Sequence, residues 1–507
     1  MYVYLIGAGP GDPGLLTCKG RKALSEADVV VYDYLASDEL LSIARPDAEM
    51  IYVGKIAGNH AMKQPDINKL LVRKAKEGKT VARLKGGDPY IFGRGGEEAE
   101  ELVDAGVPFE EIPGISSSIA GPAYAGIPLT HRAYSSSVTI ITGHEDPTKP
   151  DSSHDWSALA RSASTLVFLM GMKNLPDIAE KLMQNGLPGS TPAALVHWGT
   201  TDHQRSLAST LEDLPAAAVR EHFANPSVIV VGDVVRLKEK LDWFEQKPLF
   251  GRTVVVTRAR EQASGSAALF AQRGAHVIQF PTIKISPMAD TAPIDDAVRA
   301  LAGYGWVIFT SVNGVRFFRE RLRALGLDAR AFGGVKVAAI GPATAKAVES
   351  LGITPDFVPA TYVAESTAEG LLALGMKGCK VLMPRAREAR EVLPEALRAA
   401  GAQVDIVPVY ETLPSDENRA AVMEALEAGT LSCITFGSSS TVRNFFASIP
   451  AEMLKSHPEV RLAAIGPVTA GTLSEFGFTP DIQPQDFTIP ALADAVCAAF
   501  APKEDNA

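Results

Sequence analysis

The chain has 507 residues, of which 46% are hydrophobic and 21% charged, so it is longer than one ordinary core and should form two to four domains. Its formal net charge of −10 and the lack of a polybasic run argue against a nucleic-acid partner, and no apolar run is long enough for a membrane span. The four scattered cysteines have no zinc-site spacing and the start has no secretory pattern, so we expect a cytoplasmic protein without a metal.

The chain opens on M-Y-V-Y-L-I-G-A-G-P-G-D-P-G-L-L-T, in which a strand over 3–7 runs into glycines at alternate positions. A turn this rich in glycine lets backbone amides approach a ligand closely. In a dinucleotide-binding fingerprint a third glycine would stand at position 12, which is Asp12, and Asp33 at the end of the next strand would bind a ribose. Two prolines also interrupt the fingerprint, so the loop on its own leaves open which ligand it serves.

Strands alternate with helical stretches along the first half, which predicts an α/β fold. Most of these strands end in glycine or aspartate, so the turns that follow should lie on one edge of a sheet. The strands are expected at 3–7, 28–33, 80–84, 137–143, 165–171 and 227–232.

Two further glycine-rich turns follow the opening one. The stretch R-L-K-G-G-D-P-Y-I-F-G-R-G-G-E-E at 83–98 lies between a strand and an acidic helix start, and P-G-I-S-S-S-I-A-G-P-A-Y-A-G-I-P-L-T-H-R occupies 113–132. The helix dipole accounts for Glu97 and Glu98 but not for Gly-Gly-Asp-Pro or for Arg94. Three such turns on one edge indicate a ligand site.

These motifs, with V-V-Y-D and Y-V-G-K between them, closely resemble the uroporphyrinogen-III C-methyltransferases of the tetrapyrrole methylase superfamily. The resemblance implies a methylase fold over 1–245, with subdomains at about 1–133 and 134–245. It also implies S-adenosylmethionine folded between the two subdomains, and a homodimer formed through this half.

The family's site residues carry over where the motifs match. Asp33 and Lys55 match the proton acceptor and the proton donor, while Arg94 and Glu97 would bind substrate, since a guanidinium suits a carboxylate. The chain has Ser116-Ser117 where the family often has Thr-Ala, which keeps backbone contacts possible. The implied cofactor contacts are Pro10, Gly86, Gly87, Asp88, Ile91, Ser116, Ser117, Met170 and Gly199.

A seam divides the chain at 236–252, R-L-K-E-K-L-D-W-F-E-Q-K-P-L-F-G-R. A charged, helix-like stretch ends there at Pro248 and Gly251, and a β-branched strand, T-V-V-V-T-R, follows. The second half is therefore expected to be a separate α/β domain that begins at 251.

The second half repeats itself with a period of about 125 residues, far above that of solenoids. Two copies of one α/β unit predict two similar lobes with a cleft, and the repeated segments are strand-to-helix turns, where open α/β sheets bind ligands. The pairs are R-A-R-E at 258–261 and 385–388, I-F-T-S-V-N-G-V-R-F-F at 308–318 with I-T-F-G-S-S-S-T-V-R-N-F-F at 434–446, and V-A-A-I-G-P-A-T-A at 337–345 with L-A-A-I-G-P-V-T-A at 462–470.

Together with F-P-T-I-K-I and P-V-Y-E-T, these segments resemble uroporphyrinogen-III synthase. The resemblance implies a bilobed α/β fold over 251–507, with lobe 1 at about 251–288 plus 412–505 and lobe 2 at about 289–411. Its substrate is hydroxymethylbilane, a linear polycarboxylate, for which helix starts, hydroxyls and arginines are suitable partners. Tyr410 matches the residue that assists loss of the hydroxyl group, and the substrate-binding candidates are Thr310, Ser311, Asn313, Gly341, Ser438, Ser439, Ser440 and Gly466.

The product of the second family is the substrate of the first. The two resemblances together imply a bifunctional enzyme that closes hydroxymethylbilane to uroporphyrinogen III and methylates it twice to precorrin-2, at the siroheme and cobalamin branch. Two alternatives stay open: a methylase that acts on a later corrin precursor, and a second half that binds tetrapyrrole only as a sensor or scaffold.

Overall fold

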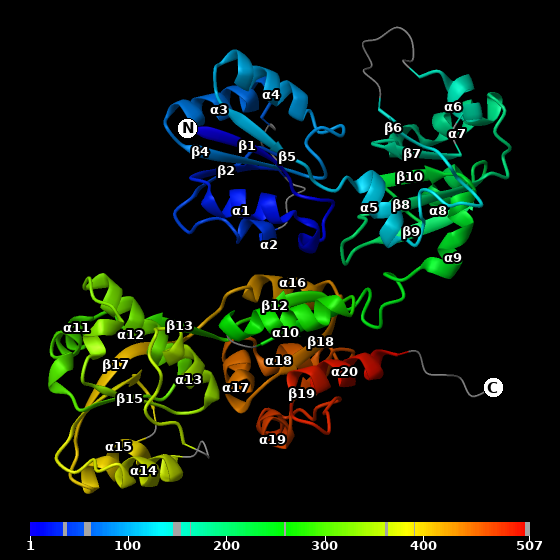
Figure 1. The fold of residues 1–507 in the computed structure, drawn as a ribbon. Helices are drawn as coiled ribbons and strands as arrows, with labels where there is room; N and C mark the ends of the chain where they lie inside the picture. Colours follow the sequence, from blue (N-terminus) through cyan, green and yellow to red (C-terminus); the bar gives the residue numbers. More distant parts are fainter. Residues whose placement is uncertain are drawn as a thin grey trace. The chain divides into compact units, whose positions relative to one another are not determined.

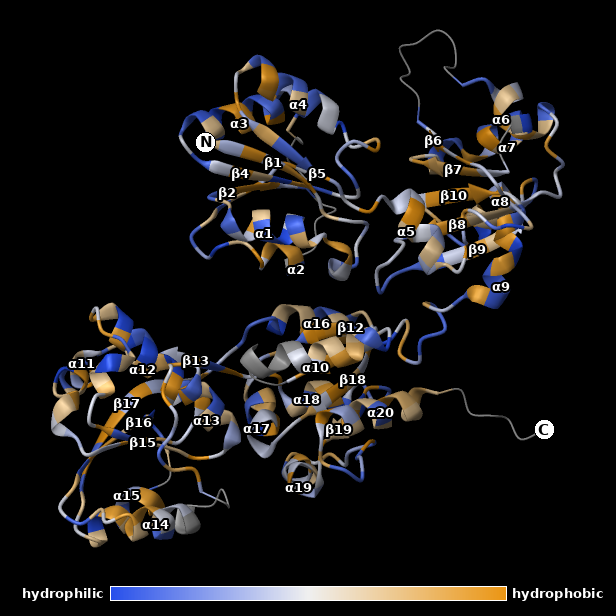
Figure 2. Cartoon of the chain, viewed as in Figure 1, coloured by the Kyte–Doolittle hydropathy of each residue, from blue (hydrophilic) through white to orange (hydrophobic). Residues whose placement is uncertain are grey.

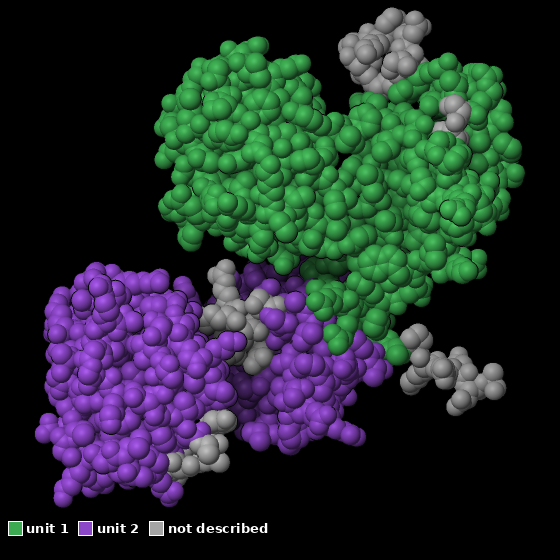
Figure 3. Space-filling model, viewed as in Figure 1, with its two compact units in different colours: residues 1–252, 271–276, 500–507 green, residues 253–270, 277–499 purple. Residues whose placement is uncertain are grey.

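The computed structural model describes residues 1–33, 38–54, 62–144, 154–162, 164–257, 260–359, 364–389 and 391–501. Contacts divide the chain into two compact units, one made of 1–252, 271–276 and 500–507 and the other of 253–270 and 277–499 (Figure 3). Both units are α/β, which confirms the predicted fold class. None of the helices in the described ranges is long and apolar enough to cross a membrane.

The first sheet of the first unit is parallel and has the order β3-β2-β4-β1-β5. Helices α3 and α4 cover one face and α1 and α2 the other, each over its own hydrophobic core (Figure 1). The strands are β1 (Tyr2–Gly7), β2 (Val29–Tyr32), β3 (Glu49–Tyr52), β4 (Thr80–Lys85) and β5 (Phe109–Ile112), and the helices are α1 (Cys18–Glu26), α2 (Asp38–Leu41), α3 (Gln64–Lys76) and α4 (Gly95–Asp104).

The second sheet of this unit is mixed, with the order β6-β7-β10-β8-β9. Only the β6–β7 pair is parallel; the other three pairs are antiparallel. Its strands are β6 (Val138–Thr142), β7 (Thr165–Leu169), β8 (Pro192–His197), β9 (Arg205–Thr210) and β10 (Ser227–Val231), and its helices are α5 (Ser117–Tyr124), α6 (Trp156–Ser162), α7 (Leu175–Gln184), α8 (Leu214–Arg220) and α9 (Lys238–Leu241).

The six strands predicted in the first half are all present, as β1, β2, β4, β6, β7 and β10. These strands carry the continuous β-branched runs that the interior of a sheet favours, and Figure 2 shows that the strands are largely hydrophobic. The sequence analysis missed β3, β5, β8 and β9. Of these, β3, E-M-I-Y, and β5, F-E-E-I, are short edge strands with charged residues.

The second unit has a four-stranded sheet, β12-β11-β18-β19, and a five-stranded sheet, β13-β17-β16-β14-β15. The first contains β11 (Thr253–Val256), β12 (His276–Gln279), β18 (Leu431–Phe436) and β19 (Arg461–Ala464), with α10 (Arg260–Gln272), α16 (Arg419–Glu427), α17 (Ser439–Ser448), α18 (Ala451–Lys455), α19 (Pro467–Glu475) and α20 (Ile489–Phe500). The second contains β13 (Ile283–Pro287), β14 (Trp306–Phe309), β15 (Lys336–Ala339), β16 (Lys380–Ala386) and β17 (Gln403–Pro414), with α11 (Ala292–Arg299), α12 (Val312–Ala324), α13 (Pro342–Glu349), α14 (Ala364–Ala373) and α15 (Val392–Ala399).

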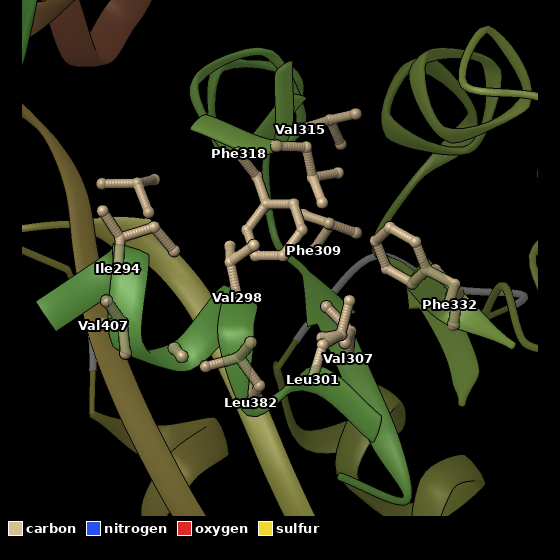
Figure 4. Close-up of a cluster of buried hydrophobic side chains, with 14 of the residues drawn as sticks. Ile294, Val298, Leu301, Val307, Phe309, Val315, Phe318, Phe332, Leu382 and Val407 are labelled. Carbon is tan, nitrogen blue, oxygen red and sulfur yellow. The ribbon is translucent and has the colours of Figure 1, made fainter. Parts of the chain in front are cut away.

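A core of aromatic and aliphatic side chains holds α11 and α12 against the five-stranded sheet. Phe309 of β14 and Phe318 of α12 lie edge to face, with ring centroids 5.5 Å apart (Figure 4). Ile294 and Val298 of α11 join the same cluster. This packing fixes the start of α12, which follows β14 directly.

Strand β13 lies in a different sheet from the one that the sequence indicated. We assigned 283–288 to the first lobe, but β13 pairs antiparallel with β17 in the five-stranded sheet. The 12-residue β17 is long enough to pair with β16 over its first part and with β13 over its last. Sequence periodicity reveals a strand but not its partner.

The sequence T-P-D occurs at 354–356 and again at 479–481, and it has the same structure in both copies. Asp356 accepts a hydrogen bond from the amide of Val337 at 2.7 Å, and Asp481 accepts one from Leu462 at 2.7 Å. Each segment also forms an isolated parallel bridge to the strand beside it. The repeat is therefore a structural duplication, in which an aspartate satisfies the amide near the start of β15 or β19.

Candidate functional site

Three glycine-rich turns meet at the carboxyl ends of β1, β4 and β5. A Cβ atom on Gly7 would lie 2.4 Å from the Cα of Gly114, and one on Gly114 would lie 2.2 Å from the carbonyl oxygen of Gly87. Both distances are below any real contact, and both neighbours are backbone. The turns can therefore meet this closely only without side chains.

Hydrogen bonds join these turns. Gly9 and Gly87 exchange backbone hydrogen bonds at 2.7 and 3.2 Å. Asp88 accepts from the amides of Tyr90 and Ile91 with one oxygen, at 2.8 and 3.1 Å, and from Gly114 with the other, at 3.1 Å. The Asp88 carboxylate, predicted as a cofactor contact, thus ties the second turn to the third.

The third turn runs into the start of α5. Ser116 is the N-cap, and its hydroxyl accepts from the amide of Ser118 at 3.3 Å. A Cβ on Gly87 would lie 3.8 Å from the Cα of Ser116 and 3.9 Å from the amide nitrogen of Ser117. The second turn therefore lies against a helix N-terminus, whose free amides and dipole favour polar or anionic ligand groups.

The second sheet contributes turns with unusual backbone. Met170 follows β7 with φ 56°, and Trp198 and Thr200 follow β8 with φ 46° and 74°. A Cβ on Gly199, between these two, would lie 2.8 Å from the Cα of Gly121 in α5. Such φ values cost free energy in non-glycine residues and persist where the surroundings enforce them, often at functional sites.

Asp12, the residue that breaks the dinucleotide fingerprint, links the opening loop to the second subdomain. Its amide donates to the hydroxyl of Thr200 at 3.1 Å, and its carboxylate accepts from the hydroxyl of Tyr124 at 2.7 Å and from the amide of Gly14 at 2.7 Å. Burial and this acceptor raise the pKa of Tyr124, so the phenol stays a donor. The link holds Pro10 and its neighbours beside the turn after β8.

A double-mutant cycle tests this link. Asp12→Ala and Tyr124→Phe should each destabilise the first unit, and their effects should couple by about 1 kcal/mol, because either change alone removes the same hydrogen bond. Urea unfolding of the full chain with cofactor absent measures the coupling. Additive effects would show that the hydrogen bond does not form.

Asp33 follows β2 and its side chain is 28% exposed. The Nη2 of Arg83, in the neighbouring β4, donates to its Oδ2 at 3.2 Å. Lys55, the predicted proton donor, lies outside the described residues. The structure therefore places the predicted base at the carboxyl edge of the sheet that carries the three turns.

Arg94 and Glu97 form an exposed ion pair at the start of α4. Arg94 Nε donates to Glu97 Oε1 at 2.8 Å, and Nη2 donates to Oε2 at 2.6 Å. Hydrogen bonding to Arg94 lowers the pKa of Glu97. Arg94 has φ 60°, and Phe92 near it has φ 54°. The two predicted substrate residues thus contact each other, and the fork of Arg94 is occupied by Glu97.

In the second unit, residues after β14 meet β17. Ser311 caps α12 by accepting from Gly314 at 3.0 Å, and its hydroxyl lies 3.1 Å from that of Tyr410. The Tyr410 ring stacks on Phe317 with centroids 5.6 Å apart, and the guanidinium of Arg316 lies 4.3 Å from the centre of the Phe317 ring. Tyr410 is thus held between a hydroxyl and an aromatic ring, with a cation nearby.

Two arginines of the second R-A-R-E copy lie at the end of β16, next to Tyr410. Arg385 is 5% exposed and pairs with Glu391. Arg387 donates from its amide to the carbonyl of Tyr410 at 2.9 Å, and its Nη1 lies 2.7 Å from Glu411 Oε2. The sequence showed this motif as a repeat, but we assigned it no role. Arg258, in the first copy, lies outside the described residues.

The remaining candidates occupy helix starts. Thr310 follows β14, Asn313 is in the first turn of α12, and Gly341 caps α13 with φ 91°. The other candidates lie in the helices beside the four-stranded sheet. Ser438 caps α17 in a capping box, Ser439 accepts from the hydroxyl of Thr472 at 2.8 Å, and Gly466 caps α19. The Oγ of Ser440 lies 2.9 Å from that of Ser438.

Two protein families match consecutive parts of the chain. Residues 2–215 match Tetrapyrrole (Corrin/Porphyrin) Methylases, and residues 264–494 match Uroporphyrinogen-III synthase HemD. A porphyrin biosynthesis protein HemD of Ruminiclostridium josui is 40% identical over 456 residues, which are 89% of this chain and 90% of that relative. The chain belongs to both families, joined in one polypeptide.

Other relatives match the methylase half alone. A uroporphyrinogen-III C-methyltransferase of Priestia megaterium is 52% identical over 236 residues, 46% of this chain and 98% of that protein. A crystal structure of the Thermus thermophilus uroporphyrin-III C-methyltransferase with S-adenyl homocysteine is 39% identical and covers 47% of this chain and 100% of its own, with a TM-score of 0.41. The two family matches and the Ruminiclostridium josui relative confirm, at the level of family, the resemblances drawn from the two sets of motifs.

One group of side chains bears on the expectation that no metal is needed. Among the described residues, possible metal-binding atoms of Asp202, His203 and His276 all lie within 4.8 Å of one another. Two of the three residues are only half-buried and the third is exposed. The metal-free enzyme therefore stays a prediction.

Proposed function

We propose that this chain catalyses two consecutive steps of tetrapyrrole biosynthesis. The synthase half closes hydroxymethylbilane to uroporphyrinogen III with inversion of the last ring and loss of water, and the methylase half methylates that product twice to give precorrin-2. The observation that carries the proposal is the union of the two families over 89% of one chain at 40% identity. The product of the synthase half is the substrate of the methylase half, so one polypeptide would carry two successive activities.

The residues of the methylase half fit S-adenosylmethionine. Gly7, Gly87 and Gly114 contact one another without side chains, so a ligand could approach the backbone closely beside the N-terminus of α5. We assign the cofactor to Pro10, Gly86, Gly87, Asp88, Ile91, Ser116, Ser117, Met170 and Gly199. When bound, the cofactor supplies an electrophilic methyl group.

The chain itself has to orient the pyrrole and accept a proton. Transfer of a methyl group to a ring carbon depends mainly on alignment, and the ring system then loses a proton to a base. We assign this proton to the carboxylate of Asp33, with Lys55 as the donor for the ring system. We assign Arg94 and Glu97 to substrate binding; Arg94 would bind a carboxylate of the substrate, for which it has to exchange its partner Glu97.

In the synthase half, the chain mainly has to hold a flexible polyanion in one conformation. Hydroxyls and helix starts at Thr310, Ser311, Asn313, Gly341, Ser438, Ser439, Ser440 and Gly466 are suited to carboxylates, and Arg385 and Arg387 add positive charge beside Tyr410. We assign Tyr410 a supporting role in loss of the hydroxyl group. We also infer a cytoplasmic enzyme that dimerises through its methylase half.

Replacing Tyr410 with phenylalanine should lower the synthase rate by less than about 10-fold, because the hydroxyl would contribute one hydrogen bond, worth about 1 kcal/mol. The ring still stacks on Phe317, so the fold should not change. The rate of uroporphyrinogen III formation by the full-length enzyme measures this, with methyl transfer as the internal control. A loss of several orders of magnitude would make Tyr410 essential and contradict the supporting role.

A coupled assay of the full chain tests the proposed function. Freshly made hydroxymethylbilane should give the type III isomer without S-adenosylmethionine, and a doubly methylated product with it, identified by mass and spectrum. Type I isomer alone would show that the synthase half only binds tetrapyrrole. Methylation of a later corrin precursor but not of uroporphyrinogen III would contradict the methylase assignment.

A further inference from the structure

Behind Asp33 lies a cluster of three buried charged side chains, Arg83, Lys85 and Glu98. The sequence analysis gave none of them a role in the site. Val29 and Val31 of β2 alternate with residues on the other face, so Asp33, two residues further on, lies on the side of α3 and α4. Val81, Arg83 and Lys85 of β4 share that same side by the same alternation. Glu98 is in the first turns of α4, which packs over these strands.

Hydrogen bonds connect the cluster to Asp33. Arg83 donates from Nη2 to Asp33 Oδ2 at 3.2 Å and from Nε to Glu98 Oε1 at 3.3 Å. Lys85 Nζ donates to the same Glu98 oxygen at 2.8 Å. The other nitrogen of Arg83, Nη1, donates to the carbonyls of Leu84 and Val31 at 3.0 and 3.4 Å. Every nitrogen of the guanidinium therefore has an acceptor, and one of the acceptors is the proposed base.

Burying this charged cluster costs more free energy than a purely structural role would explain. Glu98 is 0% exposed, Arg83 3% and Lys85 4%. Removing such charges from water costs more than apolar side chains of similar size would, so a buried ion cluster is weak evidence for stability. Burial lowers the pKa of Lys85, and Arg83 adds to this effect while Glu98 opposes it. Oε2 of Glu98 accepts no hydrogen bond from any described residue.

We propose that Arg83 is a positioning residue for Asp33, and that Glu98, with Lys85, fixes Arg83 in the orientation that serves this role. Arg83 holds the Asp33 carboxylate toward the edge where the three turns meet. Glu98 offsets the positive charge of Lys85, which would otherwise repel Arg83, and it also accepts a hydrogen bond from Nε of Arg83. Arg83 therefore stays beside Asp33. The inference rests on the proposed role of Asp33 in methyl transfer.

The groups around Asp33 show which variants isolate the role of Arg83. Arg83 and Lys85 lie on β4, on the side of Asp33, Glu98 reaches Asp33 through Arg83, and Gln64 of α3 donates to Glu98 at 3.0 Å. Arg94 and Glu97 form their ion pair at the start of the same helix as Glu98. Methionine at position 83 removes the donor that orients Asp33, whereas lysine keeps a charged donor without the planar fork.

The test compares Arg83→Met, Arg83→Lys and Glu98→Gln in the full-length enzyme. Arg83→Met should lower kcat for methyl transfer by about 10- to 100-fold, with the Kd of S-adenosylmethionine changed by less than about 2-fold. The loss should be in kcat and not in the KM for uroporphyrinogen III. Arg83→Lys should recover part of the kcat, and Glu98→Gln should show a smaller loss of kcat than Arg83→Met.

The control is Arg45→Met, which also removes a positive charge from this subdomain but breaks only an ion pair with Asp47 and Asp28. It should leave kcat and KM for methyl transfer unchanged. Thermal unfolding and synthase activity of each variant report whether the chain is folded; if Arg83→Met does not fold, Arg83→Lys and Glu98→Gln give the answer.

Two outcomes would overturn the inference, and they are distinguishable. If Asp33→Ala lowers methyl transfer but the Arg83 and Glu98 variants lose only thermal stability, with kcat and KM unchanged, the cluster is structural. If Asp33→Ala is fully active, the role of Asp33 in the proposed function fails, and the positioning role fails with it.

Discussion

Replacing Asp33 with alanine should lower methyl transfer by about 10²- to 10⁴-fold, the range that a positioned general base contributes. Cofactor binding should be largely kept, because the Asp33 side chain lies after β2 and the glycine contact involves the turns after β1, β4 and β5. Initial rates with uroporphyrinogen III and calorimetric titration with S-adenosylmethionine measure the two effects separately. Lys55→Ala should behave alike.

Asp47→Ala is a matched control for Asp33→Ala. It removes a carboxylate of the same subdomain whose partner is the exposed Arg45, and exposed ion pairs contribute little. The methyl-transfer rate of this control should equal that of the wild type. If Asp33→Ala also turned over at the wild-type rate, the base would have to be another group.

The family could be read from the sequence because it depends on local signals. Glycine-rich turns after β-branched strands predicted a ligand site at one edge of the sheet, and the structure brings those turns together through Gly7, Gly87 and Gly114. The broken fingerprint also has a physical reason: Asp12 is not a failed glycine but an acceptor for Tyr124, more than a hundred residues away.

The residues that the sequence did not reveal are those whose role depends on contacts between residues distant in the chain. Arg83 and Lys85 look like strand residues before a turn, and Glu98 looks like a helix-start acid favoured by the dipole. Only the pairing of β2 with β4 and the packing of α4 show that they form one buried cluster with Asp33. A charged residue with period-2 alternation on a buried strand was the available signal, and it marked both Arg83 and Lys85.

The duplication in the synthase half shows that a sequence repeat does not separate structural from functional residues. The T-P-D segments follow the repeated turns that we expected to bind ligand, whereas their Asp356 and Asp481 satisfy strand amides. We gave the R-A-R-E repeat no role, yet the guanidinium of Arg387 pairs with Glu411, the residue after Tyr410. Repetition shows common ancestry of two segments, and only the partners of each side chain separate scaffold from site.

Gly114→Ala should disable the methylase half while leaving the synthase half active. The new Cβ would lie 2.2 Å from the carbonyl oxygen of Gly87 and 2.6 Å from the Cα of Gly7. Both are backbone atoms that no rotamer change can move, so the turns must separate, at a cost of about 1–3 kcal/mol. S-adenosylmethionine should bind at least about 10-fold more weakly, since that factor corresponds to about 1.4 kcal/mol.

Calorimetric titration, urea unfolding and both activities of the full chain measure these effects, and Gly96→Ala is the control. A Cβ on Gly96 meets no heavy atom within 4 Å, and the residue is inside α4. Alanine there should raise stability by up to about 1 kcal/mol, because glycine is a poor helix former. If Gly114→Ala bound the cofactor as the wild type does, the meeting point of the three turns would not be the cofactor site. Loss of synthase activity in the same variant would mean that the damage spreads beyond the methylase half.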